Sequence, residues 1–408
     1  MKKITLFNVY KFELPLKKEL IVKNNKLYKR EGLLINIETS DGLSGLGEIS
    51  PLPFFHNENI DDVRLQIKEL KQNNFFLKKI ESLFKKSNSF NVLINSKNIV
   101  SKNSEKELPG ITSIKSFTSF LNKLNDAFSD IRVYPSVRAG FEMAIISLLF
   151  INSKLEKSLI AAKDSALPVC RLIVDLKKGL KKEILEIIKN EYKAIKIKVG
   201  RDLLEKEICS IQKIKKLILE NQINTIKLRI DANSLWSLSE AIYFGKAIGS
   251  SLIEYIEDPL DNISEYEQFF TDTGIPVALD EKLPDLIDMG KINETYRKCP
   301  DYLKAIIIKP DFIGGFSKTA SLLKFAHENG IKLVLSNSFN SSLLISFIVL
   351  FAGMMHLNDI PLGIDSLSFF SENLLVEDIK IIKGKINMLE VFKNIKKINL
   401  NLLSSAGF

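Results

Sequence analysis

A series of short apolar segments between residues 170 and 365 restricts the fold of this 408-residue chain more than any other feature. They have the length and composition of buried strands, and stretches with helical spacing lie between several of them. In chain order they are CRLIVDL, AIKIKVG, TIKLRIDAN, LIEYIEDP, IPVALDEK, LKAIIIKP, KLVLSNS and IPLGID. Strands alternating with helices predict an α/β fold with a (β/α)₈ barrel or a close relative. A doubly wound sheet is the main alternative, although no glycine-rich phosphate fingerprint follows any of these strands.

Charged residues stand at the C-terminal ends of five consecutive predicted strands. Lys196 and Lys198 point to the same face of the second strand, because strand side chains alternate between faces. The following strands end in Asp231, Glu257, Asp280 and Lys309, in that order. Since the C-terminal ends of barrel strands meet at one mouth, where active sites of this fold lie, we expect these charges to converge there.

Three converging carboxylates repel one another unless a cation lies between them. Ligands that are all oxygens favour Mg²⁺, with Mn²⁺ also possible. The histidines His56, His327 and His356 lie at no predicted strand end, which disfavours a zinc site. Each acid alone could cap a helix or form a surface ion pair, but three in succession favour a metal site. A lysine beside such a metal can act as a base near neutral pH, and the alternative for Lys198 is a structural ion pair.

The motifs KIKVG, RIDAN, IEDP, ALDEK and IIIKP, in that order, resemble the barrel of the enolase superfamily, in its muconate-lactonizing subgroup. The resemblance implies an enolase-type (β/α)7–8 barrel with an α+β capping domain. The expected parts are a capping domain at 1–165 with a Lys/Asn-rich insertion near 68–108, the barrel at 166–375, and a tail at 376–408 that returns to the capping domain. N-terminal strands, and helices near 59–86, 114–126 and 135–151, would build the capping domain.

Further stretches resemble the o-succinylbenzoate synthase family within this subgroup. They are KREGLLINIET (29–39), GLGEISPLP (45–53), PSVRAGFEMAI (135–145) and LSNSFNSSL (335–343). The resemblance implies a hydro-lyase of menaquinone biosynthesis, which dehydrates 2-succinyl-6-hydroxy-2,4-cyclohexadiene-1-carboxylate to 2-succinylbenzoate with Mg²⁺. N-acylamino acid racemases and dipeptide epimerases share parts of these stretches and are the alternative. The acidic DxD pair common in dipeptide epimerases is not seen in IDSLS (364–368), which favours the synthase.

The resemblance also implies roles for the residues at the strand ends. Lys198 would remove the proton alpha to the substrate carboxylate, and Lys196 would lower the pKa of Lys198 and help bind that carboxylate. Lys309 would stabilise the enolate as a cation, whereas in a racemase it would be a second acid and base. Mg²⁺ would be bound by Asp231, Glu257 and Asp280, and the bound ion would also stabilise the enolate.

Four residues are expected to contact the substrate. Arg229 lies one strand alternation before Asp231 and would face the cavity, with a barrel-core ion pair as its alternative. Gly314, Gly315 and Ser336 match regions that meet the succinyl tail in the family, although the glycines could equally form a tight turn. Lys282 departs from the family pattern, in which a small residue would follow DE.

The net charge of +9 does not require a nucleic-acid partner. The stretch 68–108 holds nine lysines, four glutamates and no arginine, which is a Lys/Asn bias rather than a pattern for reading bases. We therefore expect a small-molecule carboxylate substrate and no nucleic acid. The intact set of lysines and carboxylates disfavours a further alternative, a basic binding barrel without catalytic activity.

The remaining features predict a cytoplasmic protein that binds no membrane. Cys170, Cys209 and Cys299 are odd in number and far apart, as expected for reduced thiols. The N-terminus has no long apolar run and no cleavage site of a signal peptide. The apolar stretch 341–357 contains serines and a glycine and is interpreted as a buried helix. The sequence leaves open whether the protein is a monomer or a homo-oligomer.

Overall fold

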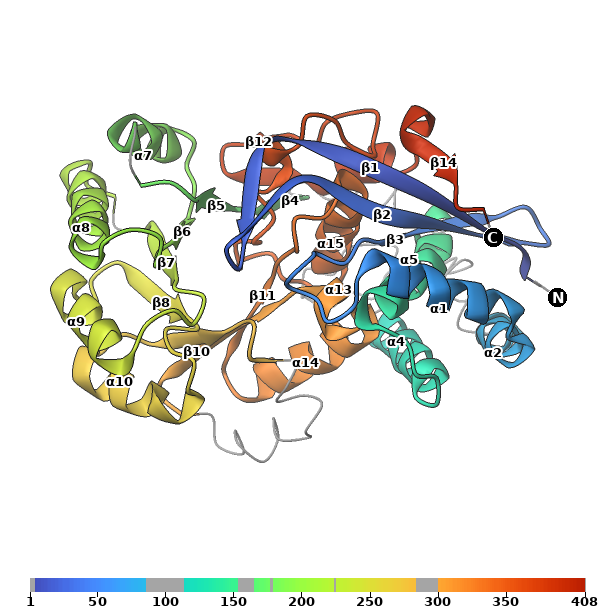
Figure 1. Ribbon diagram of the computed structural model, residues 1–408, viewed down its shortest axis with the longest axis horizontal. Helices are drawn as coiled ribbons and strands as arrows, with labels where there is room; N and C mark the ends of the chain where they lie inside the picture. Colours follow the sequence, from blue (N-terminus) through green and yellow to red (C-terminus); the bar gives the residue numbers. More distant parts are fainter. Residues whose placement is uncertain are drawn as a thin grey trace, which may run out of the picture.

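The computed structural model describes residues 4–85, 114–152, 165–176, 179–223, 225–283 and 300–407. A long antiparallel sheet with its helices lies beside a curled parallel sheet with helices around it (Figure 1). The α/β architecture with a separate antiparallel cap is therefore confirmed. Residues 86–108 of the predicted insertion, and Cys299, lie outside the described residues. The expected limits of the three parts of the chain stay predictions.

The antiparallel sheet, which we call the cap sheet, joins both ends of the chain. Its strand order is β14–β1–β2–β3. The strands are β1 (Ile4–Val22), β2 (Asn25–Thr39), β3 (Ser44–Ile49) and β14 (Leu403–Ser405). A two-residue turn, Lys23–Asn24, connects β1 to β2 with φ of 42° and 66°, the left-handed values of a type I′ hairpin. The predicted turn at SDG follows β2 and leads to β3.

Helices cover the cap sheet and approach it closely. They are α1 (Ile60–Gln72), α2 (Asn74–Lys85), α4 (Ile114–Phe128) and α5 (Pro135–Asn152). Helix α5 lies directly on β3, and glycines on both elements permit the contact: a Cβ on Gly47 would lie 1.9 Å from the carbonyl oxygen of Gly140. The backbones of helix α5 and strand β3 are in direct contact here, because no side chain separates them, and this close packing fixes the helix against the strand.

Seven parallel strands form the second sheet, in the order β11–β10–β9–β8–β7–β6–β5. They are β5 (Cys170–Ile173), β6 (Ala194–Lys198), β7 (Lys227–Asp231), β8 (Ile253–Glu257), β9 (Val277–Leu279), β10 (Leu303–Ile308) and β11 (Lys332–Leu335). The predicted eighth strand is reduced to two parallel bridges, from Leu362 to Val169 and from Gly363 to Ser336. These bridges connect the two edges of the sheet, so the doubly wound alternative is wrong and the barrel interpretation is confirmed.

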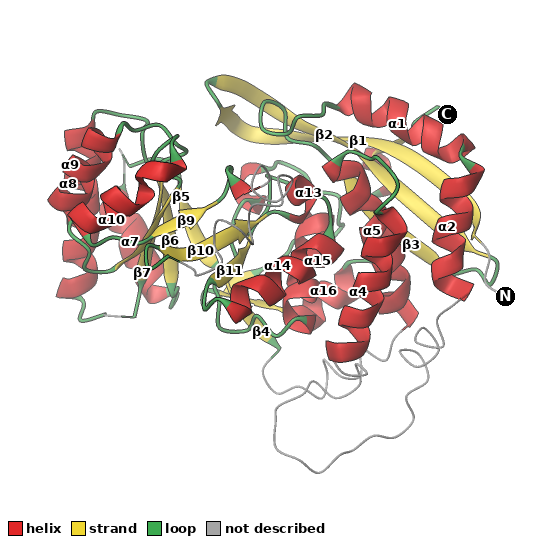
Figure 2. Ribbon diagram, turned by 90° about the horizontal axis from the view of Figure 1, so that it is seen from below, coloured by secondary structure: helices red, strands yellow, loops and turns green. Residues whose placement is uncertain are grey.

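The barrel strands alternate with helices, as expected. The helices are α7 (Leu180–Lys189), α8 (Leu204–Glu220), α9 (Leu238–Ile248), α10 (Tyr266–Thr273), α13 (Pro310–Ile313), α14 (Phe316–Glu328) and α15 (Ser342–Met354). Helices α7 to α10 gather beside β5 to β9, and α14 and α15 lie nearer the cap (Figure 2). All residues of α15 are buried, which confirms the buried helix predicted from 341–357. No helix in the described part of the chain could span a membrane.

Several small elements, most of them from the last part of the chain, complete the structure. A three-stranded sheet contains β4 (Ala166–Pro168), β12 (Ile381–Ile382) and β13 (Lys385–Asn387), and helix α16 covers Met388–Asn394. The described residues also form the short 3₁₀ helices η1 (Ile263–Glu265), η2 (Leu367–Phe369) and η3 (Leu400–Leu402). One continuous apolar core extends through cap and barrel helices, while a smaller cluster around Tyr255 and Val334 is separate. The cap is thus packed on the barrel.

We expect Gly47→Ala to lower the free energy of unfolding by about 1–3 kcal/mol, the usual cost of overpacking a filled core. The new methyl group would meet a backbone carbonyl, which cannot rotate away. Denaturant unfolding followed by circular dichroism measures the effect. An unchanged midpoint would show that helix α5 is free to move away from β3.

Candidate active site

The two lysines on β6 lie among carboxylates from the neighbouring strands. Lys196 Nζ lies 3.0 Å from Asp231 Oδ2 and donates a hydrogen bond to Glu257. Lys198 Nζ lies 3.2 Å from Asp231 Oδ2 and donates to Asn233 Oδ1 over 3.2 Å. Strand pairing sets Lys198 beside Asp231, and Asp231 beside Glu257. The convergence predicted from the strand ends is therefore present.

The opposing lysine follows β10 and binds the third carboxylate. Lys309 Nζ lies 2.7 Å from both carboxylate oxygens of Asp280, which follows β9. The ring of Phe55, a residue that follows the cap strands, lies with its centroid 4.4 Å from Lys309 Nζ. A cation and an aromatic face at this separation attract each other. Lys309 is thus held from two sides, once by the barrel and once by the cap.

Burial and charge move the pKa values of the two lysines of β6 in opposite directions. Burial alone would lower the pKa of Lys196, but attraction to Asp231 and Glu257 outweighs it and raises this pKa well above its ordinary value. Burial lowers the pKa of Lys198, and the attraction of Asp231, which acts to raise this pKa, offsets the lowering only in part. Burial also raises the pKa of Glu257 to about 7, against the attraction of Lys196. Lys196 is therefore the firmly charged member of the pair, and Lys198 gives up its proton more readily.

A buried carboxylate that the sequence analysis did not single out supports the end of β9. Asp258 Oδ2 accepts hydrogen bonds from the backbone N–H of Glu281, at 2.7 Å, and of Asp280, at 3.2 Å. Burial, with Asp280 nearby, raises the pKa of Asp258 to about 8. The sequence did contain a signal for Asp258, because IEDP and ALDEK each have a second acid directly after the strand-end acid. Such a second carboxylate can accept hydrogen bonds from backbone N–H groups instead of binding a ligand.

Arg229 lies in the barrel interior below the carboxylates and is 1% exposed. Its Nε donates to Glu254 Oε2 over 2.7 Å, and its Nη1 donates to the carbonyl oxygen of Pro361 over 2.8 Å. Lys332 pairs with the other oxygen of Glu254. These contacts match the barrel-core ion pair that the sequence left open, and the substrate-orienting role of Arg229 stays a prediction.

The other predicted substrate contacts lie near the seam between barrel and cap. Gly314 and Gly315 end helix α13 with φ of 92° and 114°, and a Cβ on Gly315 would lie 2.4 Å from Glu142 Oε2 of the cap. The two glycines therefore form a tight turn against the cap. Ser336 Oγ donates to the carbonyl oxygen of Gly363 over 3.0 Å, which helps close the barrel. Contact of these three residues with substrate stays a prediction.

Lys282, the expected departure from the family pattern, pairs with the exposed Asp261. Its charge is therefore directed to a carboxylate at the rim, away from the buried acids. The side chain is 24% exposed, whereas that of Asp261 is 86% exposed. An exposed pair of this kind contributes little to stability.

The chemistry of the carboxylates fits Mg²⁺, which prefers oxygen ligands. Asp231, Glu257 and Asp280 are all buried, and Asp231 Oδ2 has no hydrogen-bond partner among the described residues despite its two ammonium neighbours. As they stand, no three acidic, histidine or cysteine side chains of the described residues are grouped to hold a metal ion. Lys196 and Lys309 instead contact the carboxylate oxygens, so a bound Mg²⁺ would have to replace some of these contacts.

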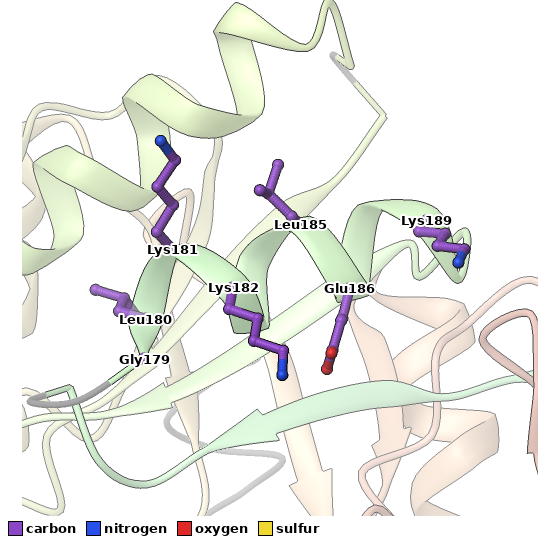
Figure 3. Close-up of a pocket in the computed structure, with 7 residues that line it drawn as sticks. All are labelled: Gly179, Leu180, Lys181, Lys182, Leu185, Glu186 and Lys189. Atoms are coloured by element: carbon purple, nitrogen blue, oxygen red, sulfur yellow. The ribbon is translucent and has the colours of Figure 1, made fainter.

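A separate hollow lies on the surface of helix α7, away from the strand ends. Figure 3 shows its lining side chains, all from the start and length of this one helix. They are Gly179, Leu180, Lys181, Lys182, Leu185, Glu186 and Lys189. The hollow contains no strand-end carboxylate, and a single acid among three lysines supplies no catalytic set. We therefore place the candidate active site at the barrel mouth.

A parallel barrel that gathers lysines and carboxylates at its strand ends, under an antiparallel cap, defines a class of protein. The description "Enolase C-terminal domain-like" matches residues 179–390, which is more than half of the chain. The protein belongs to the enolase superfamily. The description "MenC, N-terminal domain" matches residues 3–91.

Among curated relatives, the chain is similar to o-succinylbenzoate synthases. It is 28% identical over 377 residues to that of Aliivibrio salmonicida, with 90% of this chain and 91% of the relative covered. It is 27% identical over 384 residues to that of Pasteurella multocida, with 92% and 93% covered. Protein PHYLLO, chloroplastic, of Arabidopsis thaliana is 25% identical over 92% of this chain, which spans only 22% of that protein. The predicted resemblance is confirmed.

Solved structures share the fold over most of their length. MenC from Desulfotalea psychrophila superposes with a TM-score of 0.69 at 18% identity, covering 94% of this chain and all of the other. The L-Ala-D/L-Glu epimerase from Bacillus subtilis gives 0.67 at 19% identity, with 95% and 96% covered. An enolase superfamily member from Roseovarius nubinhibens, complexed with magnesium, gives 0.67 at 15% identity, with 95% and 93% covered. At these identities the likeness concerns the fold alone.

We expect Arg229→Met to lower the free energy of unfolding by roughly 3 kcal/mol, because it leaves a buried carboxylate with only Lys332 as partner. The KM for substrate should change little, since the guanidinium faces Glu254 and Pro361. Unfolding in guanidinium chloride and steady-state kinetics on the same preparation distinguish a structural role of Arg229 from a role in substrate binding. A large rise in KM with unchanged stability would instead establish Arg229 as a substrate-binding residue.

Proposed function

We propose that the protein is an o-succinylbenzoate synthase, which dehydrates 2-succinyl-6-hydroxy-2,4-cyclohexadiene-1-carboxylate to 2-succinylbenzoate. The observation that carries the proposal is the position of Lys198 beside Asp231, with Lys309 beside Asp280 on a distant strand of the same barrel mouth. Proton removal next to a carboxylate requires a base and positive charge for the enolate, and this arrangement offers both. The match to the MenC N-terminal domain supports this reaction among those of the superfamily.

In the proposed reaction, Lys198 begins as a neutral amine. Its Nζ takes the proton from the ring carbon that bears the carboxylate, and the electrons of that C–H bond pass into the enolate. The enolate then expels the hydroxyl group from the adjacent ring carbon, and the ammonium of Lys198 returns the proton to the departing oxygen as water forms. The ring becomes aromatic, which supplies much of the driving force. The lowered pKa of Lys198 agrees with this role.

The other two lysines act as cations in this proposal. Lys196, whose pKa is raised by Asp231 and Glu257, stays protonated and disfavours a second charge on Lys198 nearby. Its ammonium also attracts the substrate carboxylate. Lys309 is held by Asp280 and by the ring of Phe55, so it presents a fixed positive charge toward the enolate. Neither residue has to exchange a proton with the substrate for dehydration.

Asp231, Glu257 and Asp280 would hold Mg²⁺, or Mn²⁺ in its place. When bound, the ion would supply further positive charge where the substrate carboxylate becomes an enolate. Burial of the three carboxylates excludes water that would otherwise weaken this attraction.

A racemase of N-acylamino acids or an epimerase of dipeptides is the second candidate. The observation that favours it is that Lys198 and Lys309 both reach the site, as a two-base exchange at one carbon would require. The fixed position of Lys309 between Asp280 and Phe55 favours the dehydration, in which this lysine only contributes charge.

The proposal includes a small-molecule carboxylate as the binding partner, as the sequence predicts. The relatives that cover most of this chain are named after reactions of small molecules, which supports it. A cytoplasmic location and the absence of a nucleic-acid partner remain predictions from composition and charge.

We expect Lys198→Ala to lower kcat for dehydration by roughly 10³-fold, the usual contribution of a general base. Treatment of the wild-type protein with EDTA should also abolish turnover, and added Mg²⁺ should restore it. Absorbance of the aromatic product measures both effects. Lys193→Ala, which removes an exposed lysine just before β6, is the matched control and should not change the rate. Wild-type protein that gives no 2-succinylbenzoate with Mg²⁺ would refute the synthase assignment.

Lys309→Arg should distinguish the two candidate reactions. Arginine keeps the positive charge but does not release a proton in proteins, so dehydration should fall by less than about tenfold, or 1.4 kcal/mol in activation free energy. A two-base racemase would lose the exchange of the α-proton almost completely. Product absorbance and deuterium incorporation into N-acylamino acids give the two rates. Wild-type protein that exchanges the α-proton without dehydration activity, and loses this exchange in Lys309→Arg, would favour the second candidate.

A further inference from the structure

The tip of the β1–β2 hairpin contacts the barrel mouth through Lys23. Its Nζ lies 3.6 Å from Glu281 Oε2, and Glu281 directly follows the proposed metal ligand Asp280. The Lys23 side chain is 58% exposed and that of Glu281 is 19% exposed, so the pair lies at the rim of the site. The carboxylate of Glu281 is therefore one of the points at which the cap contacts the barrel.

The same carboxylate is connected to Lys198 through one amide. Asn233 Nδ2 donates to Glu281 Oε1 over 3.2 Å, and Asn233 Oδ1 accepts from Lys198 Nζ over 3.2 Å. An amide donates from nitrogen and accepts on oxygen, so an acceptor at Glu281 fixes which end faces Lys198. Without that acceptor, the amide could rotate and present its own N–H groups to the ammonium, which would disfavour the contact.

The backbones that carry Glu281 and Asn233 are themselves fixed. The N–H of Glu281 donates to the buried Asp258, and the N–H of Asn233 donates to Asp231 Oδ1 over 3.2 Å. Asn233 has a φ of 49°, a left-handed conformation that asparagine tolerates better than most residues. The two side chains therefore extend from rigid points, and their mutual contact is part of the folded barrel.

The hairpin turn provides an independent observation. Its first residue, Lys23, has a φ of 42°, where asparagine, aspartate or glycine is preferred in a type I′ turn. Lysine is not among the residues preferred at this position, so the turn alone does not account for it. Its side chain contacts Glu281 and, at 6.0 Å, the face of Phe55.

We propose that Glu281 is a positioning residue that couples the seating of the hairpin tip to the placement of Lys198. It receives Lys23 with one oxygen and orients the Asn233 amide with the other, so that Lys198 Nζ is held for proton removal when the cap lies on the barrel. The inference rests on the proposed function for the role of Lys198 as the base. It adds Glu281, Asn233 and Lys23 to the residues that determine the rate.

The test compares four variants of the full chain with Mg²⁺ present. Glu281→Ala should lower kcat by roughly 10- to 100-fold with a smaller change in KM, because a misplaced base costs about this much. Glu281→Gln keeps an acceptor for Asn233 and loses only the attraction for Lys23, so its loss of kcat, about 3- to 5-fold, should be smaller than that of Glu281→Ala. Lys23→Asn, which suits the turn, should reproduce the loss seen with Glu281→Gln. The control is Lys26→Asn, since Lys26 is 57% exposed and pairs within the hairpin with Glu19.

A double variant decides whether the residues act together. If Lys23 acts through Glu281, the loss in kcat for Lys23→Asn with Glu281→Gln should equal that of either change alone. Losses that multiply would overturn the coupling, and a wild-type kcat in Glu281→Ala would overturn the positioning role.

A crystal structure of Glu281→Ala gives a readout that does not depend on the reaction. The proposal expects Lys198 Nζ to lie beyond hydrogen-bond distance of Asn233 Oδ1 in this variant and within it in the wild type. An unchanged contact would overturn the proposal. Wild-type protein without dehydration activity would refute the proposed function but would leave this structural comparison decisive for Glu281.

Discussion

The contact of Lys196 with two buried carboxylates, Asp231 and Glu257, allows the acids and lysines to share one end of the barrel. Leaving a buried charge without a partner costs several kcal/mol, so each of these groups depends on its neighbour. The strand register supplies the partners, because it sets β6, β7 and β8 with their charged ends side by side. The same charge balance raises the pKa of Lys196, and burial lowers that of Lys198. Structure and reactivity thus follow from one arrangement of charges.

The cap is joined to the barrel by polar contacts as well as by apolar packing. Arg30 on β2 donates to the carbonyl oxygens of Ser50 and Pro51 in the cap and of Phe339 in the barrel. Ser341, at the start of α15, donates through its backbone N–H to Glu48 of β3 over 3.0 Å. Hydrogen bonds with fixed directions specify how the two parts fit, whereas apolar surfaces alone would allow sliding. Lys23, in the hairpin turn of the cap sheet, and Phe55, which follows that sheet, can therefore reach the site from a distant part of the sequence.

The barrel strands and their charged ends could be predicted because both depend on local rules. Alternation set Lys196 and Lys198 on one face, and the parallel barrel brought Asp231, Glu257 and Asp280 to one end. Phe55, Asn233 and Glu281 could not be predicted in this way, since their contacts depend on loop conformation and on how the cap packs. Arg229 shows the limit of alternation: it faces the interior as expected, but Glu254 and Pro361 use its donors. The alternation along a strand predicts to which face of the strand a side chain points. Which groups that side chain contacts is determined by the three-dimensional packing.

The pairing of β14 with β1 has a consequence for how the protein is made. Tyr10, Lys11 and Phe12 pair with residues 403–405, so one edge of β1 waits for nearly the whole chain to be synthesised. At 5–20 residues per second, that interval is roughly 20–80 s. An open strand edge invites pairing with other chains, and lysine and proline are the residues that discourage it. Strand β1 contains Lys11, Pro15, Lys17 and Lys18. These residues disfavour pairing of β1 with other chains in the interval before residues 403–405 are synthesised.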